Sequence, residues 1–271
     1  MTDVRDGPGD STALPDRLAA LVSDLASPDP AVRDEGAFSG LAELAAGGDL
    51  DAHLVGLGDR AAALLSAPEV QARSFGALLV ALVVDRDNRT GRAGDPAVRR
   101  LLAAVLRWYG DESDTRGHDD ELGWLHAVAH GADALGELAA SPRLSRDDLE
   151  VALDALVRRA SGPAAQHWLQ DEDDRVAVAI MAVLRRDLLG ADEVQNAVDI
   201  LAAGWRESPS GPVKAAADNT VRLARTLHLQ LVLGVRAEPD GPVVHPAVQG
   251  DALRLLGRAL AEVHWFYGSP T

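Results

Sequence analysis

The sequence contains no cysteine, so neither a disulfide framework nor a thiolate metal site or nucleophile can form. Aromatic residues make up only 4% of the chain, while alanine and leucine dominate. This composition favours close-packed helices over a sandwich or barrel rich in valine, isoleucine, tyrosine and threonine. The longest apolar run, residues 77–84, is far too short to span a bilayer.

Basic residues are scarce: 26 lysines and arginines face 42 aspartates and glutamates, which gives a formal charge of -16. Such a chain repels phosphate backbones and anionic lipid heads, so we expect no nucleic-acid partner and no membrane partner. The acidity is typical of a soluble cytoplasmic protein. Residues 1–13 are rich in Asp, Gly and Pro and have almost nothing to bury. We expect them to be a disordered lead-in without a signal peptide, followed by a single helical domain over 14–268.

Apolar residues recur with helical period throughout the chain, and no segment shows convincing strand alternation. Polar loops are expected at 85–94 and 110–120. Helix pairs begin near residues 14, 50, 95, 145 and 191, a spacing close to the roughly 40 to 47 residues of HEAT or armadillo pairs. We therefore predict an all-α fold, a HEAT-like solenoid of about 11 to 12 helices with a concave face. The expected helices are 14–26, 30–47, 50–66, 68–84, 96–109, 123–140, 145–160, 171–189, 192–205, 212–233 and 246–266.

Several helix starts share a pattern in which an acidic residue or proline precedes valine and arginine. The arginine then lies near the helix N-terminus, where it can reach a neighbouring loop. We predict that Arg33, Arg73 and Arg175 join neighbouring repeats.

The chain is organised around residues 123–137, which read GWLHAVAHGADALGE. On a helix, His126, His130, Asp133 and Glu137 fall within one narrow stripe, because 4, 7 and 11 residues are close to whole turns. Apolar and small residues flank this stripe on both sides, so the column is expected to face a crevice between helices. Trp124 lies across the same helix and is expected in the core.

Three interpretations of this column remain open. In the first, His126, His130 and Asp133 bind a divalent metal ion, and Glu112, Asp114 or Glu172 completes the site. The protein would then be a metal-dependent enzyme of the hydrolase or oxygenase type, with Glu112 or Glu172 as acid or base.

In the second interpretation, the histidines are held by Asp133, Arg116 and Asp114 in a purely structural network that locks the long loop onto the central helix. In the third, the same groups read a small molecule or peptide in a polar pocket. A scaffold for protein–protein contacts is a further alternative. The candidate ligand-binding side chains are His126, His130, Asp133, Glu112, Asp114, Arg116, Glu172 and Arg175.

Five motifs, in order, resemble the bacterial domain of unknown function family 2785 over residues 15–235. They are Arg33-Asp34 with Ala37, residues 73–78 (RSFGAL), Glu112-x-Asp114-x-Arg116-Gly117, residues 123–133 (GWLHAVAHGAD) and Glu172-Asp173-x-Arg175. The resemblance implies an all-helical, HEAT-like fold and offers no reaction. We therefore expect a bacterial cytoplasmic binding protein that holds a small molecule or peptide in a central polar pocket on the concave face.

Overall fold

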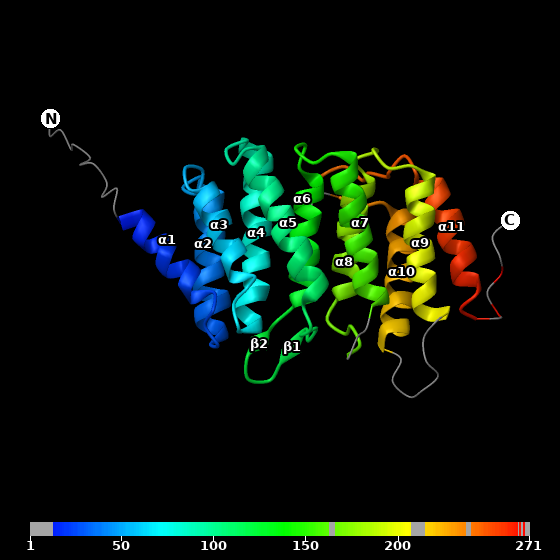
Figure 1. Ribbon diagram of the computed structural model, residues 1–271, viewed down its shortest axis with the longest axis horizontal. Coiled ribbons are helices and arrows are strands. Elements are labelled where there is room, and N and C mark those ends of the chain that lie inside the picture. Colours follow the sequence, from blue (N-terminus) through cyan, green and yellow to red (C-terminus); the bar gives the residue numbers. More distant parts are fainter. Residues whose placement is uncertain are drawn as a thin grey trace.

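The computed structural model describes residues 13–162, 166–206, 215–236, 240–264, 266 and 268 (Figure 1). Within these ranges the chain forms eleven α-helices, one π-helical segment and two short strands. The prediction of an all-α fold is confirmed. Of the expected lead-in over 1–13, residues 1–12 lie outside the described residues, and Ala13 begins the first helix.

Short connections join most of the successive elements along the chain. In chain order these elements are α1 (Ala13–Asp24), the π-helical η1 (Ala31–Phe38), α2 (Ser39–Gly47), α3 (Leu54–Leu64), α4 (Val70–Thr90), α5 (Asp95–Asp111), β1 (His118–Asp119), β2 (Gly123–Trp124), α6 (Ala127–Ala140), α7 (Arg146–Ser161), α8 (Glu172–Leu184), α9 (Ala191–Arg206), α10 (Ala215–Leu233) and α11 (Gln249–Ala261).

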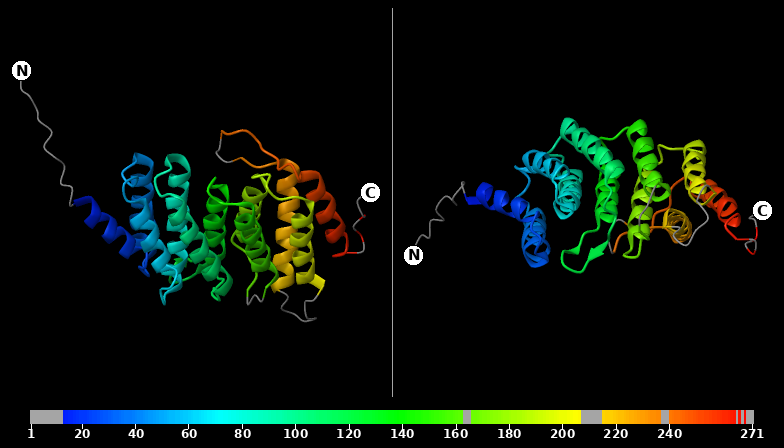
Figure 2. Two further views of the ribbon diagram at one scale, coloured as in Figure 1. Left: turned by 45° about the horizontal axis from the view of Figure 1, so that its top comes forward. Right: turned by 60° about the horizontal axis from the view of Figure 1, so that its bottom comes forward.

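The helices stand side by side in a row, and α1 and α11 lie at opposite ends of that row (Figure 1). Alternate helices make up two layers. Helix α6 packs between α4 and α8, and α8 packs on α10, while α3, α5, α7, α9 and α11 follow one another in the second layer (Figure 2). No described helix combines the length and the apolar character needed to cross a bilayer.

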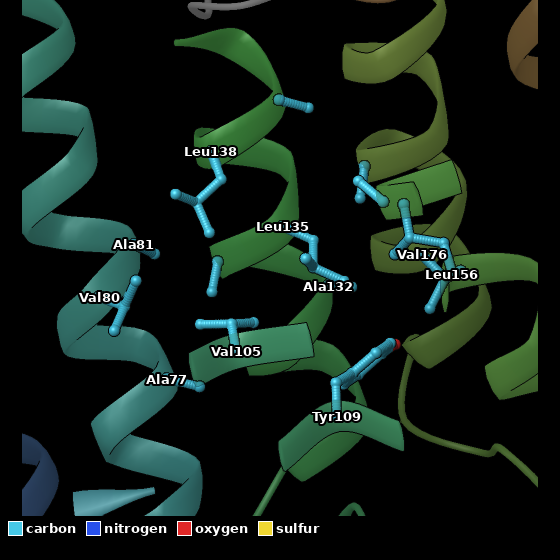
Figure 3. Close-up of a cluster of buried hydrophobic side chains, with 14 of the residues drawn as sticks. Ala77, Val80, Ala81, Val105, Tyr109, Ala132, Leu135, Leu138, Leu156 and Val176 are labelled. Carbon is cyan, nitrogen blue, oxygen red and sulfur yellow. The ribbon is translucent and has the colours of Figure 1, made fainter. Parts of the chain in front are cut away.

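Helix α6 is buried along most of its length, because small residues let its neighbours approach closely. Ala132 and Leu135 of α6 are fully buried and lie near Ala77 of α4 and Val105 of α5 (Figure 3). Gly131 faces the ring of Tyr109, and a Cβ at this position would lie only 2.5 Å from Tyr109 Cε2. The sequence of α6 therefore fixes both its burial and its distance from α5.

Helix α4 is longer than expected, so the loop predicted at 85–94 is wrong over its first six residues. The charged residues of this turn are held by partners on both sides. Arg86 pairs with Asp51 at 2.6 Å, and the buried Asp87 accepts a 2.9 Å bond from Arg143. The helix ends at Thr90 and is followed by Gly91, whose φ of 70° suits glycine. Long-range ion pairs thus continue a helix whose local sequence is polar.

Helix α6 is shorter than expected, because the chain forms a hairpin before it. His118 pairs with Trp124 and Asp119 with Gly123 in antiparallel register. The Asp119 carboxylate accepts bonds of 3.0 Å from the backbone N–H groups of Glu121 and Leu122, which closes the turn. The expectation of no strand is therefore wrong here, and an isolated bridge joins two further residues, Val235 and Val244.

The close contact at Gly131 yields a prediction for stability. Gly131→Ala places a methyl group against Tyr109 and 3.1 Å from Trp108 Cζ3, so we expect the free energy of unfolding to fall by about 1 to 3 kcal/mol. Gly136→Ala on the same helix meets Ala179 at an ordinary 3.4 Å and is expected to be neutral or to stabilise by about 0.5 to 1 kcal/mol. Urea unfolding of both variants beside the parent measures the difference. Equal effects of the two substitutions would contradict the packing described.

Candidate functional site

His126 lies outside the helix that carries His130, so the predicted single column is wrong at its first residue. His126 directly precedes α6 and has φ 49°, in the left-handed region. The carbonyl of Gly117 accepts bonds from both Leu125 N at 2.9 Å and His126 N at 3.1 Å, and these bonds hold the chain in the bend. The two imidazole rings still approach, with their centroids 5.6 Å apart.

His130 is buried in the core and held by Ser74 of α4. Its Nδ1 lies 2.9 Å from Ser74 Oγ, and the Ser74 hydroxyl donates to the carbonyl of Leu125. Because that hydroxyl has one proton to give, His130 Nδ1–H acts as the donor to Ser74. The ring of Phe75 meets His130 edge-on at 5.1 Å. Burial, followed by the nearby His126, lowers the pKa of His130 well below its ordinary value, so the ring is neutral.

Trp124 is half exposed rather than buried in the core, because it lies on β2 of the hairpin. Its side chain is 47% exposed and stacks on His126 at a centroid distance of 4.7 Å with an interplanar angle of 4°. His118 meets the same indole at 4.8 Å. Burial, and then the charge of Arg175, lowers the pKa of His126. An aromatic stack therefore covers the start of α6.

The structural network predicted to join His126, His130 and Asp133 to the long loop does not form. Asp133 instead pairs with Arg175 of α8, whose Nε lies 2.7 Å from Asp133 Oδ1. Arg116 pairs with Asp114 at 2.6 Å and with Asp119, all within the loop itself. Burial raises the pKa of Asp133, and Arg175 opposes that effect. Two separate sets of ion pairs take the place of one network.

Glu112 and Glu172 are held by different partners. Glu112 receives two bonds from Arg73, at 2.6 and 2.9 Å, and one of 2.8 Å from Trp108 Nε1. Burial raises the pKa of Glu112, but these bonds outweigh it and the net shift is downward. Glu172 is 1% exposed and accepts a 2.9 Å bond from Gln170 N, and burial raises its pKa.

The contacts of Arg33, Arg73 and Arg175 confirm that each joins separate elements. Arg33 donates to the carbonyls of Leu122 and Trp124, while Arg73 pairs with Glu112 and Arg175 pairs with Asp133. Among the residues that the structure describes, no three histidine, aspartate or glutamate side chains gather as a metal site requires. The expected ligands His126, His130 and Asp133 therefore do not form a three-ligand cluster.

Asp133 and Arg175 line a groove over α4, α6 and α8, with a volume of about 610 Å³. Glu112 instead lines two other hollows, one with Arg73 and one of about 830 Å³ with Arg159. The groove over α4, α6 and α8 also includes Glu137. Small residues, among them Ala132 and Gly136, line its floor. Sequence reasoning missed its polar members on α4 and at the end of α8, which are Asp85, Asn88, Arg89 and Arg185. The helical spacing of Asp85 and Arg89, which form an i,i+4 pair at 3.0 Å, was the signal that could have found two of them.

Glu137 is a strongly perturbed carboxyl of this groove. Burial raises its pKa to about 7, with further raising by Asp85 and Asp133 and an opposing effect of Arg89. No ion pair joins its carboxylate to any residue in the described ranges. Small changes of pH near neutrality therefore change the protonation state of Glu137, which is a common property of functional carboxyls.

A protein-family model for the family described as "Protein of unknown function (DUF2785)" matches residues 66–229, which is more than half of the chain. The chain belongs to this family. The match runs from just before α4 into α10 and so includes all three helices of the groove, while the Arg33-Asp34 motif lies before it. The family confirms the resemblance drawn from the sequence and assigns no activity.

Other comparisons add little to the family. No curated protein matches the sequence. A crystal structure titled as that of an engineered protein is 16% identical, with a TM-score of 0.45, covering 91% of this chain and 96% of its own. At this identity and score the likeness carries no argument about fold or function.

The contacts of His130 predict a structural role for that residue. His130→Ala removes the bond to Ser74 and leaves a hole beside Phe75, so we expect the free energy of unfolding to fall by about 3 kcal/mol. His126→Ala, which removes a half-buried ring stacked on an exposed indole, is expected to cost about 1 kcal/mol. Chemical unfolding of the two variants tests this order. A loss at His130 no larger than that at His126 would contradict it.

The raised pKa of Glu137 predicts how stability depends on pH. The folded protein keeps the Glu137 proton up to about pH 7, whereas the unfolded chain releases it near the ordinary value of 4.5. Its contribution to stability is therefore complete below pH 4.5 and is lost as pH rises through 7. Relative to the parent, Glu137→Gln should gain roughly 1 to 3 kcal/mol between pH 4.5 and pH 8.

Urea unfolding at these two pH values measures that gain. Glu43→Gln, at an exposed position on α2, is the control and should shift the parent's curve equally at both pH values. If Glu137→Gln behaves like the control, the carboxyl of Glu137 titrates normally and the assignment is wrong.

Proposed function

We propose that the two-layer row of helices is a HEAT-like solenoid and that the groove over α4, α6 and α8 lies on its concave face. Two observations support this. Helix pairs recur at intervals near those of HEAT repeats, and alternate helices build each layer. We further propose that the protein works in the bacterial cytoplasm without a nucleic-acid or membrane partner, as its charge of -16 favours.

The function that the geometry supports best is binding of a small molecule or peptide in this groove. Its volume of about 610 Å³ falls in the range of roughly 300 to 1,000 Å³ that ligand sites occupy. The observation that carries the proposal is the convergence of Glu137, the Asp133–Arg175 pair and Arg185 on one hollow from two neighbouring helices. Rigid helices hold these groups, so little ordering is needed on binding.

The metal-dependent enzyme has weaker support than the binding protein. His130 Nδ1 is engaged by Ser74, and both oxygens of Asp133 face Arg175. A metal ion at Asp133 would have to break the pair with Arg175, and no third histidine, aspartate or glutamate joins the predicted ligands within the described ranges. The interpretation as a pure scaffold for protein–protein contacts also has weaker support, because such a surface does not need a polar groove with a perturbed carboxyl.

Blocking the groove should abolish binding without disturbing the fold. Val178 lines the groove and its side chain is 49% exposed, so Val178→Trp fills the hollow at little cost to the core. Val55→Trp on α3, where valine is 41% exposed, is the matched control. Each protein is incubated with a bacterial extract of small metabolites and short peptides, separated by filtration and denatured.

Mass spectrometry then identifies the molecules that the protein retained. We expect the parent and Val55→Trp to retain the same compound and Val178→Trp to lose it. Retention by Val178→Trp, with its thermal unfolding unchanged, would place binding elsewhere and overturn the proposal.

A further inference from the structure

We propose that the ligand of the groove is a small organic acid whose carboxylate binds Arg185 and whose apolar chain lies along α4 and α8. This inference rests on the proposed binding function and names the chemical class of the ligand. It follows from three features of the groove, which are its uncompensated positive charge, its protonated carboxyl and its apolar wall.

The positive charge comes from an arginine whose guanidinium binds no other side chain or carbonyl in the described part of the chain. Four arginines line the groove: Arg89, Arg175, Arg185 and Arg236. Arg89 and Arg175 pair with Asp85 and Asp133, and Arg236 donates to the carbonyl of Gly241. The guanidinium of Arg185 has no hydrogen bond or ion pair to any described residue. In a chain with a net charge of -16, an acidic partner for Arg185 would be easy to supply, so its unpaired state favours an anionic ligand.

Glu137 adds a hydrogen-bond donor to the lining of the same groove. The charged groups that act on its carboxyl are Asp85 and Arg89 of α4 and Asp133 of its own helix. Arg175, Arg185 and Arg236 line the same groove. With its pKa raised by burial to about 7, the Glu137 carboxyl is protonated in mildly acidic solution. A protonated carboxyl donates a hydrogen bond to a carboxylate, whereas an ionised one repels it. Binding of an organic acid is therefore expected to weaken as pH rises above 7.

The apolar part of the ligand is indicated by the walls of the groove. Leu78 and Leu82 of α4 and Val178 of α8 line it, with Phe38 at one side. The floor of the groove carries only small side chains, which belong to Ala81, Ala132, Gly136 and Ala179. A chain of methylene groups laid over this floor would cover apolar surface that water now contacts. A ligand with charge alone would leave this wall exposed.

The test uses octanoate as the probe, with octylamine and 1-octanol as cationic and neutral chains of the same length. Isothermal titration calorimetry at pH 6 and pH 8 compares the parent with Arg185→Gln. Arg100→Gln is the matched control, because Arg100 is an exposed arginine on α5, far from the groove in the other layer. We expect octanoate to bind the parent and Arg100→Gln equally and Arg185→Gln about tenfold more weakly.

The pH dependence supplies a second readout. Octanoate is charged at both pH values, so the expected weakening from pH 6 to pH 8 reports the carboxyl of Glu137. It should disappear in Glu137→Gln, whose amide donates at both pH values. A gain in affinity at pH 8, or an unchanged dependence in Glu137→Gln, would remove Glu137 from the site.

Other outcomes overturn the assignment of the ligand. Binding of octylamine or 1-octanol as tightly as octanoate, or no effect of Arg185→Gln, would show that the groove does not select a carboxylate. Tighter binding of acetyl-trileucine than of octanoate would show a peptide terminus instead of a small acid. If no probe binds, the inference fails. The proposed function then still stands or falls on the compound lost by Val178→Trp, so the two failures are distinguishable.

Discussion

The buried guanidinium of Arg33 fixes the place where the central helix begins. It donates to the carbonyls of Leu122 at 2.9 Å and Trp124 at 3.2 Å, and it lies over the ring of Phe75. These carbonyls belong to backbone that enters the protein just before α6, where unpaired polar groups are costly. Because the same segment is also bonded to Ser74 and Gly117, the first residue of α6 is held from three directions. The direction of every side chain on α6 follows from that anchor.

This anchor places groups of opposite titration behaviour on one helix. His130 points into the core and its pKa is lowered, so its contribution to stability is complete above pH 6.5 and is lost as pH falls. Glu137 lies two turns on, at the groove, and its raised pKa has the reverse effect between pH 4.5 and pH 7. The two contributions oppose each other in the same interval. The stability of the parent can therefore change little with pH although each of the two contributions changes steeply. Substitution of either residue alone would reveal the contribution of the other.

Local sequence was sufficient to predict most of the helices. It was insufficient where contacts with residues distant in the sequence determine where a helix begins or ends. The start of α7 was predictable, because Ser145 and Asp148 form a capping box. The end of α4 was not, because Arg86 and Asp87 are held by residues 35 and 56 positions away. The left-handed turn at His126 likewise depends on acceptors and donors from separate elements. For the site, sequence reasoning located Asp133 and Arg175 but attached them to histidines that serve the fold.

A residue type draws attention to a site, but the partners of that residue decide its role. His130 and Glu112 have partners for their polar atoms within the chain, so removing them damages the structure first. Glu137 differs from them. Its raised pKa means that the fold disfavours the ionised carboxylate, so a neutral amide at this position would be more stable at high pH. Nearby, the charge of Arg185 has no compensating acid among the described residues. Unfavourable groups that line one groove are expected where a ligand supplies the missing partner, since ligand binding stabilises the folded protein.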